Sequence, residues 1–386
     1  MRFEFVTARH ILFGTKAITV AAPAARQMGK HPLLVTGRNL RRAERLLGGL
    51  KKLGLKHASL TVAGEPDLEL IRRGVALARE EGCDMVISFG GGSVIDTGKA
   101  IAILLANTGD VLDYLEVVGK GEKLRGPAIP FLAIPTTAGT GSEVTQNAVI
   151  GVPEARAKVS LRSPHMLPRL ALIDPELTFE MPPELTAATG MDALTQLIEP
   201  YVCQKANLMS DMFCTEGLQR ISRSLLRAYK NGGDKQAREE MCFAAHLGGQ
   251  ALANAGLGAV HGIAGPLGAL IKAPHGALCA ALLPHTMRAN LEALRAVPPE
   301  EGEEALRRYD KIATILTGRM SAHAEDGIEW VAELCEEMGI QPLRNWGFTG
   351  ELVPELIEKA LKASSMKANP IALNEEQLKA LIEKAQ

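Results

Sequence analysis

The sequence predicts a two-domain protein, with an α/β N-terminal domain followed by an all-α C-terminal domain. In the first half of the chain, short apolar runs alternate with helical stretches, the pattern of a parallel sheet wrapped by helices. After Asp174-Pro175 the strand-like runs disappear and helical periodicity continues. The length of 386 residues also exceeds the size at which one hydrophobic core stops growing.

Four apolar runs in the first half are predicted as buried strands, and two more as strands leading out of the domain. Helical stretches lie between them, for example at 40–52 and 67–80. Pro182-Pro183 is the predicted boundary, so we expect domains at residues 1–180 and 181–386. The expected strands are Leu33–Thr36, Ser59–Val62, Met85–Phe89, Phe131–Ile134, Ala148–Val152 and Leu170–Ile173.

The second half contains a long stretch without formal charge, from Met241 to Ile271. It is long enough to span a bilayer, but its histidine, glutamine and asparagine side chains are costly in lipid. We therefore expect buried core helices of a soluble protein here, and no membrane partner. From Leu291 onward the charged, amphipathic pattern predicts surface helices.

Composition excludes several classes of protein. Hydrophobic residues make up 46% and charged residues 23%, which argues against wholesale disorder. Lys+Arg 43 against Asp+Glu 44 shows no basic excess, so nucleic acid is not expected as a partner. The six cysteines include no C-x-x-C pair, and the first residues lack the apolar core of a signal peptide. Both observations favour a reducing, cytoplasmic location.

A glycine-rich loop follows the third predicted strand. Residues Gly90-Gly91-Gly92-Ser93 precede a predicted helix, where glycines admit close backbone approach and helix N–H groups attract an anion. Ser93 with Asp96 also fits a capping box, so a capped helix after a tight turn is the alternative interpretation.

A second loop, Pro-Thr-Thr-Ala-Gly-Thr-Gly-Ser-Glu at 135–143, follows the next strand and is rich in hydroxyl groups. In open α/β sheets, ligands bind outside the carboxyl ends of the strands. Two such loops at two strand ends predict a phosphate-bearing ligand, and a dinucleotide fits, although the usual G-x-G-x-x-G pattern is absent. The N-terminal domain is therefore predicted to bind a dinucleotide.

The end of the first predicted strand bears on the choice of dinucleotide. It carries Gly37 and Arg38, with Arg41 and Arg42 close behind. A small residue followed by arginine suits the 2′-phosphate of NADP, whereas an acidic residue would bind the free 2′-hydroxyl of NAD. The alternative is a solvated basic helix start.

Four side chains in the second half form a candidate metal site. Asp192 and Gln196 are four residues apart on a predicted helix and share a face. His261 and His275 would be about 21 Å apart on one straight helix, so the chain must turn between them, at Gly265-Pro266 or Pro274. An aspartate and two histidines suit a divalent metal, and Gln196 could add a neutral oxygen. Each histidine alone is equally consistent with a structural role in the core.

At these residues the chain resembles the iron-containing (group III) alcohol dehydrogenase family, as a divergent member. The resemblance implies a dehydroquinate synthase-like architecture, a metal in the cleft between the two domains, and a homodimer. The matching segments are Phe13-Gly14, G-G-G-S-V-I-D-T-G-K at 90–99, P-T-T-A-G-T-G-S-E at 135–143, T-A-A-T-G-M-D-A-L-T at 186–195, N-A-G-L-G-A-V-H at 254–261 and P-H-G at 274–276.

The resemblance also implies roles for single residues. Asp192, His261 and His275 match three of the family's four metal ligands, and Lys158 is implied near the nicotinamide ribose. Gly91, Gly92 and Ser93 would bind the pyrophosphate. The cofactor site would further be lined by Thr136, Thr137, Thr140 and Ser142, with Asp96 and Lys99 also matching.

Three positions depart from the family pattern. Gln196 stands where the family usually has a metal-binding histidine, and Gly265 stands where a second active-site histidine is common. Gly37 replaces the common aspartate, a change that goes with NADP(H) use in this family, while NAD(H) remains possible. His246 and His285 are alternative proton relays for the missing imidazole.

The expected function is hydride transfer between NADP(H) and a small alcohol or carbonyl substrate, with Fe²⁺ or Zn²⁺ as Lewis acid. The main alternative is a metal-independent keto-acid reductase resembling maleylacetate reductases, in which His261 or His275 polarises the carbonyl as an imidazolium. A glycerol dehydrogenase-like or dehydroquinate synthase-like enzyme, and a binding protein without turnover, are further alternatives.

Overall fold

The computed structural model describes residues 3–386, which divide into two compact units. The predicted classes of the two halves, α/β and then all-α, are confirmed. The unit called the α/β unit below comprises Val6–Thr137 and Gly141–Glu180. The unit called the helical unit comprises Met181–Gln386, Ala138–Thr140 and residues 3–5.

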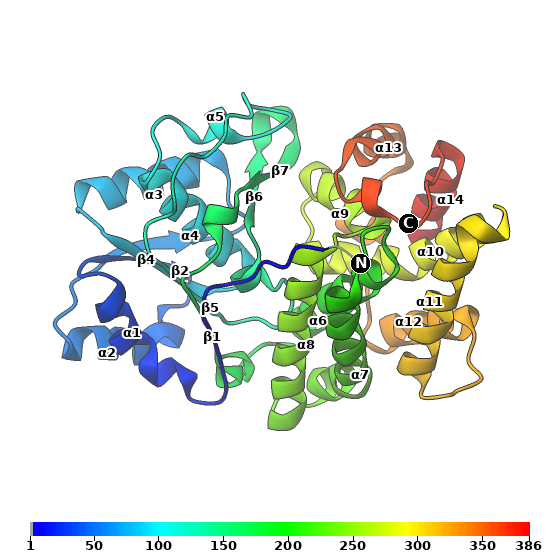
Figure 1. Cartoon of the computed structure of the whole chain (residues 1–386), viewed down its shortest axis with the longest axis horizontal. Coiled ribbons are helices and arrows are strands. Elements are labelled where there is room, and N and C mark those ends of the chain that lie inside the picture. Colours follow the sequence, from blue (N-terminus) through cyan, green and yellow to red (C-terminus); the bar gives the residue numbers. More distant parts are fainter. Residues whose placement is uncertain (1–2) are drawn as a thin grey trace. The chain divides into compact units, whose positions relative to one another are not determined.

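A six-stranded, wholly parallel sheet forms the centre of the α/β unit (Figure 1). Its order is β1-β8-β5-β4-β2-β3, and five of the predicted strands belong to it. Leu170–Ile173, expected to lead out of the domain, instead lies inside the sheet between β1 and β5, so that expectation is wrong. Strand β1 has only three residues, too few for a recognisable sequence pattern. The strands are β1 (Ile11–Phe13), β2 (Pro32–Gly37), β3 (Ala58–Val62), β4 (Met85–Gly90), β5 (Phe131–Pro135) and β8 (Leu170–Ile173).

Helices cover both faces of this sheet, as the alternation along β2 shows. Leu33 packs in one buried cluster with α3 and α4, whereas Leu34 packs in the other with α1 and α2. Figure 1 shows the two pairs of helices on opposite sides of the strands. Because both faces are covered, β2, β4 and β5 are buried along almost their whole length. The helices are α1 (Ala21–Met28), α2 (Glu44–Lys52), α3 (Leu68–Glu80), α4 (Gly92–Leu105) and α5 (Val111–Tyr114).

Two further features complete the α/β unit. An antiparallel hairpin joins β6 (Asn147–Val152), which the sequence predicts, to β7 (Ala157–Arg162), whose mixed polar sequence hides it. The helix predicted at 40–52 begins with a 3₁₀ turn at Leu40–Ala43 before α2. The one predicted at 67–80 is α3, with Asp67 as its N-cap residue.

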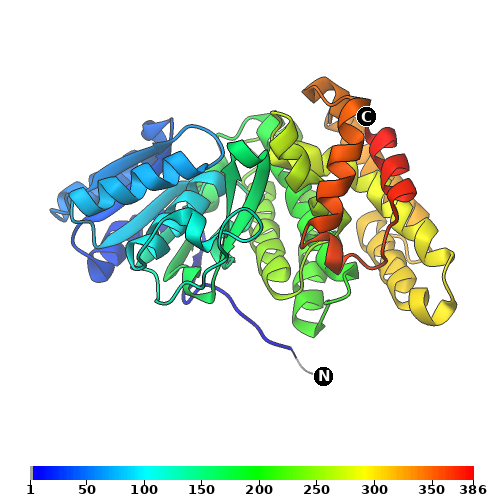
Figure 2. The same ribbon diagram turned by 90° about the horizontal axis from the view of Figure 1, so that it is seen from above.

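The helical unit contains nine α-helices among the described residues and is centred on α6 (Figure 1). Every residue of α6 from Gly190 to Pro200 is buried, so this helix is surrounded by others. Figure 2 shows α13 and α14, in orange and red, side by side. The helices are α6 (Pro183–Val202), α7 (Leu208–Lys230), α8 (Lys235–Asn254), α9 (Ala259–Leu270), α10 (His275–Arg295), α11 (Pro299–Thr317), α12 (Ala324–Glu337), α13 (Val353–Lys362) and α14 (Glu375–Ala385).

The uncharged stretch from Met241 to Ile271 is divided between α8 and α9 rather than forming one helix. Within residues 3–386 we find no helix with the length and apolar character needed to cross a membrane. The expectation that the chain starts without a signal peptide rests partly on Met1 and Arg2, which lie outside the described residues.

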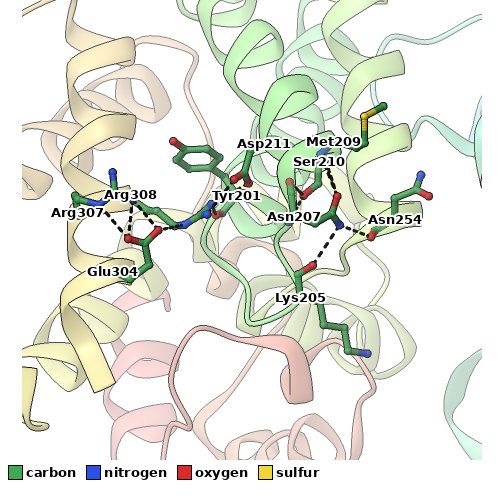
Figure 3. Close-up of polar contacts among 10 residues, drawn as sticks. All are labelled: Tyr201, Lys205, Asn207, Met209, Ser210, Asp211, Asn254, Glu304, Arg307 and Arg308. Carbon is green, nitrogen blue, oxygen red and sulfur yellow. Dashed lines mark hydrogen bonds and ion pairs between the residues drawn. The ribbon is translucent and has the colours of Figure 1, made fainter. Parts of the chain in front are cut away.

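A polar network around Arg308 ties α11 to the end of α6 and the start of α7 (Figure 3). The guanidinium donates to both carboxylate oxygens of Asp211, at 2.8 and 2.9 Å, and to the carbonyl oxygen of Tyr201 at 2.7 Å. Asn207 caps α7 and donates to the carbonyl oxygen of Asn254 at 2.9 Å. Together these contacts fix the C-terminal end of α6 to α11 and the C-terminal end of α8 to the start of α7.

Candidate metal and cofactor sites

The carboxyl ends of β2, β4 and β5 form the candidate cofactor site in the α/β unit. From β2 the chain passes to β3 on one side and then returns to β4 on the other. This reversal is a topological switch point, where a crevice opens at the ends of the two strands. Gly37, Gly90 and Pro135, the last residues of β2, β4 and β5, all lie along this edge.

The glycine loop leads directly into α4, which begins at Gly92 with Gly91 as its N-cap residue. No side chain caps this helix, so the predicted capping box of Ser93 and Asp96 is wrong. The helix begins two residues earlier than a box requires, and Asp96 instead accepts hydrogen bonds from the Ser142 hydroxyl and from the backbone N–H of Val149. The start of α4 therefore keeps the character of an anion site.

The two predicted loops lie side by side. A Cβ atom added at Gly91 would lie 3.3 Å from the side chain of Thr137, and the backbone N–H of Thr136 donates to the carbonyl oxygen of Gly90 at 3.0 Å. Gly91 therefore leaves the space through which a ligand can approach both loops. Thr140 falls in the segment that clusters with the helical unit.

A buried lysine shapes the second loop. Lys99 is 1% exposed and donates to the carbonyl oxygen of Ser142 at 2.9 Å and to the hydroxyl of Thr145 at 2.8 Å. Burial lowers the pKa of Lys99, and the neighbouring Asp96 opposes this. Asp96, Lys99 and Ser142 are thus engaged with one another and fix the loop's conformation.

The end of β2 leaves room for a side chain, because an added Cβ at Gly37 would have no neighbour within 4 Å. Arg38 and Arg41 are exposed beside it. Arg42 is engaged elsewhere, since its guanidinium donates to the carbonyl oxygens of Thr136 and Leu177. Two arginines, rather than three, therefore remain available to a phosphate.

Lys158 lies on β7 and forms an ion pair with Glu65, which follows β3. Its side chain is largely buried in the α/β unit. The sequence contains no local signal for this pairing, because the two residues are far apart along the chain.

The candidate metal site lies in the helical unit, where three helices supply its donors. Asp192 comes from the middle of α6, His261 from the first turn of α9, and His275 is the first residue of α10. Asp192 Oδ1 lies 3.4 Å from His261 Nε2 and 3.9 Å from His275 Nε2. The chain turns at 271–274, as Pro274 allows; the alternative bend at Gly265-Pro266 is wrong, because α9 continues through it.

Cys279 joins these three residues, although sequence reasoning does not find it. It lies one helical turn after His275 and is buried. One donor atom from each of Asp192, His261, His275 and Cys279 lies within 4.8 Å of the others. The four-residue spacing from His275 is the signal that could have revealed it.

Glu199 is a second residue that sequence reasoning misses. It lies two turns after Asp192 on the same face of α6. Its Oε2 is 2.7 Å from Nδ1 of His261, and its Oε1 accepts the backbone N–H of Val260 at 2.6 Å. This carboxylate orients the ring so that Nε2 faces the other donors.

The charges in the cluster stabilise one another. Burial opposes ionisation of Asp192, but the neighbouring His261 and His275 more than offset it and lower the pKa of the carboxyl. Burial likewise opposes protonation of His261, yet its neighbours Cys279, Asp192 and Glu199 raise the pKa of the ring well above its usual value.

Two buried oxygens in the site lack hydrogen-bond partners. They are Oδ1 of Asp192, a residue that is 2% exposed, and Oε1 of Gln196 on the same helix. A buried polar atom without a partner is costly, and a cation would satisfy it. The donor types and these two oxygens fit a divalent metal.

The two alternative proton relays are placed elsewhere. His246 on α8 contacts the Gln250 side chain at 2.8 Å, and His285 on α10 lines a hollow with residues of α14. Neither belongs to the group of donors around Asp192.

Two candidate ligand-binding loops at the switch point of a parallel sheet, together with candidate metal donors on helices, are typical of a dinucleotide-dependent oxidoreductase. Comparison with known proteins agrees. Residues 8–175 match the family described as iron-containing alcohol dehydrogenase. Residues 186–386 match the family described as the C-terminal part of Fe-containing alcohol dehydrogenases. The chain belongs to the iron-containing alcohol dehydrogenase family, as the motifs predict.

Individual relatives cover nearly the whole chain. The 1,3-propanediol dehydrogenase of Klebsiella pneumoniae is 36% identical over 391 residues, which span 99% of this chain and 98% of the relative. The lactaldehyde reductase of Escherichia coli is 37% identical over 315 residues, spanning 80% and 78%. A crystal structure of a 1,3-propanediol oxidoreductase superposes with a TM-score of 0.92 at 35% identity, covering 100% of both chains.

Proposed function

We propose that this oxidoreductase transfers hydride between NADP(H) and a small alcohol or aldehyde, with a divalent metal held by Asp192, His261 and His275. Oxidoreduction of alcohols and aldehydes follows from the family, and the cofactor preference and the metal are the proposed parts. The observation that carries the proposal is the convergence of His261 and His275, from two other helices, on a buried Asp192 oxygen without a hydrogen-bond partner.

The substrate class rests on the relatives. Their names point to 1,3-propanediol and lactaldehyde, which are short, oxygenated molecules. A small alcohol or aldehyde of this kind is therefore the proposed substrate of this chain.

The cofactor proposal assigns the phosphates to the two loops and the 2′-phosphate to the end of β2. Gly37 leaves space there, and the exposed Arg38 supplies charge. NAD(H) is the weaker cofactor in this proposal. The proposed cofactor-binding residues are Gly37, Arg38, Gly91, Gly92, Ser93, Asp96, Thr136, Thr137, Thr140, Ser142 and Lys158.

Each residue of the candidate metal site has a role in this proposal. Fe²⁺ or Zn²⁺ at this site would act as a Lewis acid on the alcohol or carbonyl oxygen. Asp192 supplies negative charge, Glu199 holds His261 in the required orientation, and Gln196 offers a neutral oxygen one turn from Asp192. Gly265 carries no side chain, so proton transfer to solvent would use cofactor hydroxyls, water or another side chain.

The metal-independent alternative uses His261 and His275 as acids that polarise the carbonyl directly. The raised pKa of both rings, which burial opposes and which Cys279 and Asp192 promote, is compatible with imidazolium at neutral pH. Metal content separates the two mechanisms.

The test is the metal content of untagged enzyme purified without chelator, measured by plasma mass spectrometry. We expect about one Fe or Zn per chain in the wild type and loss of the metal in Asp192→Asn. The same preparations are assayed with NADPH and NADH against a panel of short aldehydes. A wild type that stays metal-free after anaerobic soaking in Fe²⁺ or Zn²⁺, yet reduces carbonyls, would favour the metal-independent mechanism.

A further inference from the structure

We propose that Cys279 is a direct ligand of the metal, so that the strong donors of this chain are Asp192, His261, His275 and Cys279. This inference rests on the proposed function, because it requires that the first three residues hold a metal. It deepens that proposal by assigning the fourth strong bond to a thiolate instead of the Gln196 amide.

The thiol of Cys279 lies close to the ring nitrogens of both histidines. Sγ of Cys279 lies 3.6 Å from Nε2 of His275 and 4.0 Å from Nε2 of His261. For metal bonds of roughly 2.0–2.3 Å at tetrahedral angles, neighbouring donors are about 3.3–3.6 Å apart. Asp192 and His261 are already 3.4 Å apart and all four donor atoms lie within 4.8 Å of one another, so binding would draw the wider pairs closer together.

The thiol of Cys279 is buried among the other candidate donors. Cys279 is 0% exposed and lies one turn after His275 on α10, so both side chains leave the helix on the same face. Among residues 3–386 it is the one cysteine that belongs to a group of donors able to hold a metal. Its neighbours there include the buried Asp192 oxygen that lacks a hydrogen-bond partner.

Gln196 lies one turn after Asp192 on the same face of α6, where its side chain offers a neutral amide oxygen. A neutral amide oxygen is a weaker and harder donor than a thiolate, which prefers Zn²⁺. Cys279 therefore supplies the stronger bond, and this donor set favours Zn²⁺ over Fe²⁺ more than one built from imidazole and carboxylate alone.

The test is X-ray absorption spectroscopy of the Zn²⁺-loaded full-length enzyme. We expect one sulfur scatterer at about 2.3 Å beside nitrogen and oxygen at about 2.0–2.2 Å. Cys279→Ser should lose the sulfur shell, while the matched control Cys335→Ser, whose thiol donates to the Ala280 carbonyl oxygen, should keep it. Bound Co²⁺ should likewise give a near-ultraviolet thiolate-to-metal absorption band in the wild type and in Cys335→Ser alone.

The outcomes separate the two proposals. Zinc retained at about one per chain without a sulfur shell overturns the role of Cys279 and leaves the proposed function standing. A sulfur shell that persists in Cys279→Ser overturns it as well. A wild type that binds neither Zn²⁺ nor Co²⁺ overturns the metal site itself. Should Cys279→Ser fail to fold, the wild-type spectra decide, because they report sulfur directly.

Discussion

Glu199 and His261 form a 2.7 Å contact between Oε2 and Nδ1, which determines the ring nitrogen that faces the metal donors. The second oxygen of Glu199 accepts the backbone N–H of Val260, so the carboxylate is held at both ends. The contact with Glu199 fixes the ring of His261 so that Nε2 faces Asp192, 3.4 Å from its Oδ1. Helix α6 thus supplies both a donor and the support of a donor on another helix.

Replacing Glu199 by glutamine should weaken metal binding by roughly 10–100-fold, because the amide removes the charge that fixes and strengthens the His261 donor. Competition with a chromophoric chelator measures the affinity. Glu184→Gln, an exposed change in the first turn of the same helix, is the matched control and should leave affinity unchanged. Equal affinities in the two variants would mean that the contact is structural only.

Gly37→Asp should shift cofactor preference from NADP(H) toward NAD(H). An added side chain meets no atom within 4 Å, so the carboxylate can accept from a 2′-hydroxyl and repel a 2′-phosphate. A charged hydrogen bond of about 1.5–3 kcal/mol corresponds to a change of roughly tenfold or more in the ratio of the two kcat/KM values. Gly48→Asp, at another uncrowded glycine in the same unit, controls for added charge. An unchanged ratio in Gly37→Asp would refute the assignment of this strand end.

Gly265→His should add a titrating group to the pH–rate profile. Position 265 lies one turn after His261 on α9, and an added side chain has no neighbour within 4 Å at its Cβ. An imidazole there titrates near pH 6.5, so we expect kcat to depend on pH around that value. Gly265→Ala lacks the titrating group and should keep the wild-type profile. Identical profiles for the two variants would place position 265 away from proton transfer.

Arg308→Met should destabilise the helical unit by on the order of 2 kcal/mol, because it removes hydrogen bonds from a charged group and leaves Asp211 without its partner. The neighbouring Arg307→Met is the matched control (Figure 3). Arg307 is exposed and pairs only with Glu304 among the contacts found, so its loss should cost well under 1 kcal/mol. Urea unfolding of both variants measures the difference, and similar midpoints would contradict the role of the network.

Much of the fold can be read from local pattern. Strands β2, β4 and β5 are mostly apolar because helices cover both faces of a parallel sheet, and such runs are visible in any sequence. Helix α3 is bounded by Asp67, whose capping role depends on residues three positions away. The two loops follow strands directly, so their chemistry is also a local property.

Other features depend on distant contacts and escape such reasoning. The capping box predicted for Ser93 and Asp96 does not form, because the Asp96 carboxylate accepts hydrogen bonds from Ser142 and Val149 on other segments. The guanidinium of Arg42 donates to the carbonyl oxygens of Thr136 and Leu177 and so does not join the exposed arginines near Gly37. No neighbouring residue in the sequence indicates these contacts.

The candidate metal site shows the division most clearly. Residue types and helical spacing make Asp192, His261 and His275 candidate donors, and the resemblance to the family implies their role as metal ligands. The participation of Cys279 and Glu199 follows from the packing of α6, α9 and α10 against one another, which brings together residues remote in sequence. Buried side chains from different helices meet at distances that depend on every contact in the core, and no local pattern encodes them.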